Sequence, residues 1–122
     1  KHMKKGSAII NTGSITGLEG SKELLDYSAT KGAVSALSRS LAVEYAPYGI
    51  RVNTLLPGYV ETALIGRYIS NPMIAKALLT QTPLRRFGTP QDIANAALFL
   101  ASDESRCITG LELDIEAGYC IA

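Results

Sequence analysis

The 122-residue sequence has no tryptophan, one histidine and two cysteines, and aromatic residues make up only 7% of it. Cys107 and Cys120 both lie in the last quarter of the chain, and His2 lies at its other end. This distribution matches neither the ligand spacing of a zinc site nor a disulfide framework. We therefore expect two unpaired thiols in a reducing compartment and no metal.

Long apolar runs and blocks of like charge are also missing. No run approaches the roughly 20 apolar residues that span a bilayer, and no secretory signal peptide is evident. Twelve Lys and Arg against eleven Asp and Glu leave a formal net charge of +1, with no basic block that would bind nucleic acid or an anionic membrane. We expect a soluble, cytoplasmic protein with no nucleic-acid or membrane partner.

The sequence does have the length and composition of one folded domain. It is 47% apolar and 19% charged, with no low-complexity tract, and this does not fit a disordered chain. The residue patterns predict strands at 7–10, 50–56 and 111–115. They predict helices at 28–46, in short pieces over 62–82, and from Thr89-Pro90 onward, where threonine suits the N-cap and proline the first helical position.

The order of these elements is strand, helix, strand, helices, strand. Such alternation predicts parallel strands joined by right-handed helical crossovers, in an α/β layered fold. Ligands of such sheets bind beyond the carboxyl ends of the strands. Three loops are expected there: residues 11–17, residues 56–62 and the residues after Ile115.

The run YSATK places a phenol, Tyr27, four residues before an ammonium, Lys31. That spacing makes them neighbours on a helix, and a nearby cation favours the ionised form of a phenol. The pair can therefore act as an acid/base, although most Tyr-Lys pairs at this spacing have no such role. The opposite face of the helix carries only small side chains, which permits close approach of a helix from another subunit or from the same chain. Its residues are Ala29, Gly32, Ala33, Ala36 and Ser40.

Two further groups of residues bear on whether Tyr27 and Lys31 act as an acid/base. Ser14 lies in the loop after the first strand, 13 residues before Tyr27, where its hydroxyl either polarises a carbonyl or stabilises a turn. The run PGYVET, residues 57–62, closes the second strand, and it either faces a polar ligand or forms a simple Pro-Gly turn.

Together these runs resemble the short-chain dehydrogenase/reductase family. IINTGS looks like the family's strand that ends in the catalytic serine, and YSATK looks like its Tyr-x-x-x-Lys motif. RVNTLLPGYVET looks like its strand ending in Pro-Gly. RFGTPQDIANAALFLASDESRCITG looks like its penultimate helix and the turn before its last strand. The four motifs occur in the family's order over essentially the whole chain.

The resemblance implies an NAD- or NADP-dependent oxidoreductase that interconverts an alcohol and a ketone or aldehyde by hydride transfer. Tyr27 would be the general acid/base, and Lys31 would favour its ionised form and bind the nicotinamide ribose. Ser14 would hold and polarise the substrate carbonyl. The nicotinamide and phosphate side would be lined by residues of the second loop: Pro57, Gly58, Val60 and Thr62.

The chain departs from the family pattern in two places. Glu116-Ala117-Gly118 stands where the family often has Asp-Gly-Gly, and no T-G-x-x-x-G-x-G phosphate-binding turn occurs. The resemblance therefore predicts that residues 1–122 form a single fragment domain. This domain would be the C-terminal half of a doubly wound Rossmann-like parallel sheet, with about three strands and flanking helices, and would bind dinucleotide poorly alone.

Other interpretations remain open from the sequence. The chain could be a non-catalytic structural or interaction module, or a serine hydrolase, although Ser14 has only His2 as a candidate base and no Gly-x-Ser-x-Gly elbow. The expected partners are a small-molecule alcohol or ketone, beneath an apolar segment at 63–82, and copies of the same chain in a dimer or tetramer. Self-association is expected through the first strand, the small helix face or the last strand.

Overall fold

Three parallel strands form a sheet in the computed structural model, which describes residues 2–122. They are β1 (Ala8–Thr12), β2 (Arg51–Pro57) and β3 (Glu112–Ile115), with β2 in the centre. The register pairs Thr12 with Leu55 and Pro57 with Ile115. The carboxyl ends of all three strands therefore meet at one edge of the sheet, as the predicted α/β fold with about three parallel strands requires.

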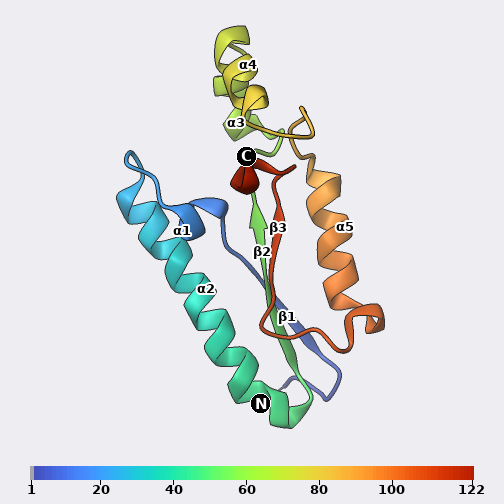
Figure 1. The fold of residues 1–122 in the computed structure, drawn as a ribbon. Coiled ribbons are helices and arrows are strands. Elements are labelled where there is room, and N and C mark those ends of the chain that lie inside the picture. Colours follow the sequence, from blue (N-terminus) through green and yellow to red (C-terminus); the bar gives the residue numbers. More distant parts are fainter. Residues whose placement is uncertain (1) are drawn as a thin grey trace.

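The two longest helices cover opposite faces of this sheet (Figure 1). α2 (Leu25–Tyr45) lies along one face and α5 (Pro90–Ala101) along the other. The core lies on β2, whose side chains Val52, Leu55 and Leu56 are buried together with Leu100 of α5 and Ala42 of α2. As expected for a central parallel strand, β2 is buried along most of its length, and its polar residues Asn53 and Thr54 are buried beside these apolar side chains.

The shorter helices gather toward the carboxyl ends of the strands (Figure 1). α1 (Ile15–Glu19) follows β1 and packs on α2, while α3 (Ala63–Ile69) and α4 (Pro72–Thr80) extend beyond the sheet. Single 3₁₀ turns occur at Ala46–Tyr48, Asp103–Ser105 and Tyr119–Ile121.

Two polar side chains of β2 hold the segment between α5 and β3. The guanidinium of Arg51 donates to the carbonyls of Leu100 at 2.8 Å and Ser102 at 3.0 Å, near the end of α5. The fully buried amide of Asn53 donates to the carbonyl of Ile108 at 3.0 Å and accepts from the amide of Leu111 at 3.0 Å. These bonds satisfy buried polar groups and fix the start of β3 against β2.

The structure differs from the sequence expectations at several element ends. Residues 11–17 are expected to form a loop, but β1 runs to Thr12 and a helix occupies residues 15–19. α2 begins at Leu25 rather than Ser28. The expected start of α5 is confirmed, because Thr89 is its N-cap and Pro90 its first residue. Within residues 2–122, no helix is both long and apolar enough to cross a membrane.

Candidate active site

Ser14 lies directly after β1 and is the N-cap of α1. It is 8% exposed, and its Oγ accepts hydrogen bonds from the Thr16 amide at 3.2 Å and the Thr16 hydroxyl at 3.0 Å. Since a hydroxyl has two acceptor positions and one donor, both acceptor positions are occupied and the hydrogen is left to donate. A hydroxyl held in this way can donate a hydrogen bond to a ligand oxygen.

Tyr27 and Lys31 lie one turn apart near the start of α2. The Tyr27 side chain is 41% exposed, and the Lys31 Nζ lies 5.6 Å from the centre of its ring. The same Nζ donates to the carbonyl oxygen of Thr12 at 2.9 Å. Lys31 therefore reaches from α2 to the end of β1, two residues before Ser14.

The structure thus brings the three predicted catalytic residues to one region. Ser14 follows the strand end that Lys31 contacts, and α1, which Ser14 caps, packs on the helix that carries Tyr27. A hydroxyl donor, a phenol and an ammonium near one another can bind an oxygen atom and exchange a proton with it.

The second predicted group lies in the loop after β2. Pro57 is the last residue of β2, and the Gly58 amide donates to the Ile115 carbonyl at 3.1 Å. Val60 forms an isolated parallel bridge with Gly88. Thr62 is exposed at the N-cap position of α3, and its side chain makes no capping hydrogen bond there. Its hydroxyl is therefore available to a ligand.

Aromatic contacts fix the same loop. The ring of Tyr59 packs edge-on against Phe87, with ring centres 6.4 Å apart, and against Tyr119, with ring centres 5.3 Å apart. The loop is thus tied both to the segment before α5 and to the C-terminal turn. β1 and β2 end at one edge of the sheet, so this loop and Ser14 lie at the same end of the molecule.

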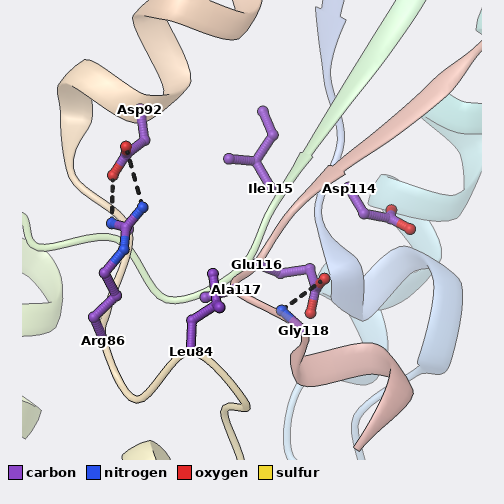
Figure 2. A pocket seen from close by; sticks show the side chains of 9 residues that line it. Leu84, Arg86, Asp92, Asp114, Ile115, Glu116, Ala117 and Gly118 are labelled. Atoms are coloured by element: carbon purple, nitrogen blue, oxygen red, sulfur yellow. Dashed lines mark hydrogen bonds and ion pairs between the residues drawn. The ribbon is translucent and has the colours of Figure 1, made fainter.

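A hollow of about 380 Å³ lies beside this region (Figure 2). The Arg86 guanidinium pairs with the Asp92 carboxylate on one of its walls, at 2.9 Å, and the residues after β3 form another. Neither Ser14 nor Tyr27 nor Lys31 lines it. The hollow is therefore separate from the predicted catalytic residues.

Residue Glu116, at the end of β3, organises the chain that follows it. Its carboxylate accepts from the amides of Gly118 at 3.1 Å and Cys120 at 2.7 Å (Figure 2 shows the first). Ala117 between them has a φ of 59°, a left-handed conformation that favours glycine. The departure from Asp-Gly-Gly seen in the sequence thus places an alanine in a glycine-type backbone conformation.

Comparison with known proteins decides the family. A family of short-chain dehydrogenases and reductases, described as enoyl-(acyl carrier protein) reductase, matches residues 1–120. The chain belongs to the short-chain dehydrogenase/reductase family. The resemblance drawn from the four sequence motifs is confirmed.

Short-chain dehydrogenases with assigned activities are among its relatives. The chain is 43% identical over 121 residues to the glucose and ribitol dehydrogenase of Daucus carota, and the match covers 99% of this chain and 41% of that protein. The chain spans about half the length of the curated relatives it matches.

Solved short-chain dehydrogenase structures share the fold. A 4-hydroxyisoleucine dehydrogenase complexed with NADH has a TM-score of 0.92 and 34% identity, over 94% of this chain and 47% of that one. An Agrobacterium tumefaciens structure with bound NADP, named provisionally as a 2-deoxy-d-gluconate 3-dehydrogenase, has a TM-score of 0.91 and 33% identity, over the same shares. The three strands and flanking helices thus match part of a Rossmann-like domain.

Proposed function

We propose that this chain carries the proton-transfer and nicotinamide-binding residues of an NAD- or NADP-dependent oxidoreductase. The enzyme would interconvert a small alcohol and its ketone or aldehyde. The observation that carries the proposal is the position of Lys31. Its Nζ lies near the Tyr27 ring and donates a hydrogen bond to the carbonyl oxygen of Thr12, two residues before Ser14. Relatives of the same family with bound NADH or NADP support the choice of cofactor.

The residues fit the nicotinamide end of such a cofactor. An ammonium has three N–H donors, and the carbonyl of Thr12 takes one from Lys31, which leaves donors for the hydroxyls of a ribose. The Thr62 side chain, which makes no capping bond, can bond the cofactor's polar groups. No T-G-x-x-x-G-x-G run occurs in the sequence, so in this proposal the pyrophosphate is bound by residues outside these 122.

Each catalytic residue has one task in the reaction. The nicotinamide, when bound, exchanges a hydride with the substrate carbon. Ser14 donates a hydrogen bond to the substrate oxygen, and Tyr27 gives or takes the proton at that oxygen. The positive charge of Lys31 near the Tyr27 ring stabilises the phenolate that forms when the proton leaves.

The proposal is tested on the enzyme that carries this chain. It is assayed with NAD⁺ and NADP⁺ against a panel of alcohols, headed by polyols and aldoses because the carrot relative is named for glucose and ribitol. We expect reduced cofactor to accumulate with at least one alcohol. Ser14→Ala should lower kcat by about 10²-fold, the usual effect of removing one hydrogen-bond donor to a reacting oxygen.

Two results would count against this function. One is the absence of turnover with either cofactor across the panel. The other is turnover that Ser14→Ala leaves unchanged. The first result, together with retained folding, would favour a non-catalytic structural or interaction module.

A further inference from the structure

Helix α1 meets helix α2 through backbone atoms at two glycines, Gly17 and Gly32. A Cβ placed on Gly17 would lie 2.7 Å from the Gly32 amide nitrogen and 2.7 Å from the Lys31 carbonyl carbon. A Cβ on Gly32 would lie 3.3 Å from the Gly17 carbonyl oxygen. The backbones of the two helices are therefore in direct contact, and this contact is possible because Gly17 has no side chain.

This contact joins the elements that carry the predicted catalytic residues. Ser14 caps α1 three residues before Gly17, and both of its hydroxyl's acceptor positions are occupied by Thr16 of the same helix. The Ser14 side chain must therefore move with α1. On the other side, Lys31 directly precedes Gly32 and Tyr27 lies one turn earlier.

The remaining links to Ser14 are already fixed. The amide of Gly13 donates to the carbonyl of Leu55 at 2.8 Å, which ties the end of β1 to β2. Lys31 holds the carbonyl of Thr12 at 2.9 Å. Because the end of β1 is held in place, the distance between the backbones of α1 and α2 sets the distance between the Ser14 hydroxyl and the Tyr27 side chain.

We propose that Gly17 and Gly32 are positioning residues: their backbone contact sets the distance between Ser14 and Tyr27, so that both hydroxyls reach one substrate oxygen. The inference rests on the proposed function. Non-bonded carbon atoms pack at about 3.5 to 4.0 Å, so a methyl group on Gly17 would push α1 away from α2 by about 1 Å. A displacement of that size in a catalytic group can cost about 10²-fold in rate.

Gly17 and Gly32 also make a matched pair for the test. Neither has a positive φ, so alanine can adopt the backbone at both sites and only the contact is changed. Gly17→Ala places its methyl group 2.7 Å from backbone atoms, whereas Gly32→Ala places it 3.3 Å from one oxygen. Alanine also favours a helix interior over glycine, so Gly32→Ala should not lower the melting temperature.

The experiment measures kcat, cofactor KM and melting temperature for the enzyme carrying each variant, with Tyr27→Phe in the same series. We expect Gly17→Ala to lower kcat by about 10²-fold and Gly32→Ala by about 3- to 10-fold, with cofactor KM changed less than about threefold in both. A change confined to kcat in a fully folded protein is not what a purely structural role produces. If Gly17→Ala does not fold, Gly32→Ala carries the test.

The outcomes separate this inference from the proposed function. If Tyr27→Phe abolishes turnover while folded Gly17→Ala and Gly32→Ala keep the wild-type kcat, the positioning role is overturned and the function stands. If the folded Gly32→Ala alone is available and keeps the wild-type kcat, the same conclusion holds. If Tyr27→Phe keeps full turnover, the proposed function fails and the positioning role fails with it.

Discussion

The two cysteines show how strongly the surroundings set the chemistry of a residue. Cys120 lies at the C-terminal turn, where burial and then the nearby carboxylate of Glu19 raise the pKa of its thiol to about 12. Glu116 and Asp114 add to this effect. Cys107 is exposed. Because the thiolate is the reactive form, Cys120 should be almost inert at neutral pH.

Alkylation distinguishes the two thiols. With iodoacetamide at pH 8, peptide mass spectrometry should find Cys107 modified first and Cys120 modified only after unfolding. Cys107→Ser is the control, and it should leave the native protein essentially unlabelled. Rapid native labelling of Cys120 would show that its thiol is neither shielded by its partial burial nor held protonated by its acidic neighbours.

A second residue, Ala117, has a backbone conformation that a glycine would adopt more easily. For residues with a side chain, the left-handed conformation costs about 1 to 2 kcal/mol, and glycine loses about 0.4 to 1 kcal/mol more entropy on folding. We expect Ala117→Gly to raise the free energy of unfolding by up to about 1 kcal/mol in urea denaturation.

The adjacent glycine is the matched control for that measurement. Gly118 has a φ of 91°, and a Cβ there would lie 2.8 Å from Cγ of Pro83. Gly118→Ala should therefore destabilise the protein. A loss of stability in Ala117→Gly would mean that the alanine side chain makes a compensating contact.

At the scale of elements, the start of α5 is the best-defined helix terminus. Thr89 and Asp92 form a capping box in which each side chain bonds the backbone of the other, and Arg86 pairs with the Asp92 carboxylate. Hydrogen bonds from Arg86 and then Thr89 hold the pKa of Asp92 well below its usual range. Because that pKa is lowered on folding, the stabilisation is complete above the unfolded value, about 3.9, and is lost as the pH falls below it.

Melting temperatures measured over a range of acidic pH test whether the stabilisation by Asp92 is lost as the pH falls. Asp92→Asn should lower the melting temperature at pH 7. The difference from wild type should shrink as the pH falls below about 4, because the carboxylate of the unfolded chain is protonated there while the folded one still resists protonation. Glu44→Gln, at an exposed position of α2, should show no such pattern. A difference that stays constant with pH would mean that the charge of Asp92 does not matter.

The elements show what the sequence can predict and where it fails. The start of α5 was predictable because Thr, Pro and Asp occupy standard cap positions. The start of α2 was not, because its N-cap is Leu24, which makes no side-chain capping bond. α1 was missed because its N-cap Ser14 and its residues Thr16 and Gly17 are equally typical of turns. Its role depends on Gly17 touching Gly32, a long-range contact that no local pattern encodes.

At the scale of the whole molecule, apolar side chains remain on the outer face of α2. Leu37 is 54% exposed and Val43 is 77% exposed. The small residues that the sequence places on one face of this helix have different surroundings. Gly32 packs against α1, whereas the others are exposed: Ala29, Ala33, Ala36 and Ser40. Exposed apolar patches often mark contact surfaces, so we propose that this face joins two copies of the chain.

Light scattering at micromolar concentration tests the contact. We expect the wild type to be a dimer or larger, and Leu37→Glu with Val43→Glu to shift it toward the monomer, because burying a carboxylate without a partner is costly. Leu98→Glu is the control, because Leu98 is exposed on α5 at the other face of the sheet. This variant should leave the oligomer intact. A monodisperse wild-type monomer would refute self-association.

The alternation of strands and helices predicted the architecture of the molecule, because parallel strands need helical crossovers. The same reasoning placed Ser14 and the loop of residues 57–62 at one end of the sheet. The orientation of the Lys31 side chain toward the end of β1 was not predictable, since it depends on the position of α2 relative to β1.

We propose that Tyr27 transfers the proton in a nicotinamide-dependent reaction, and a single substitution tests this role. Tyr27→Phe removes only the hydroxyl, and Tyr48→Phe does the same at an exposed position beyond the other end of α2. In the enzyme carrying this chain, Tyr27→Phe should lower kcat by about 10²- to 10⁴-fold, the range expected for losing a general acid/base, while Tyr48→Phe keeps the wild-type rate. Equal rates in the wild type and Tyr27→Phe would show that Tyr27 does not transfer the proton.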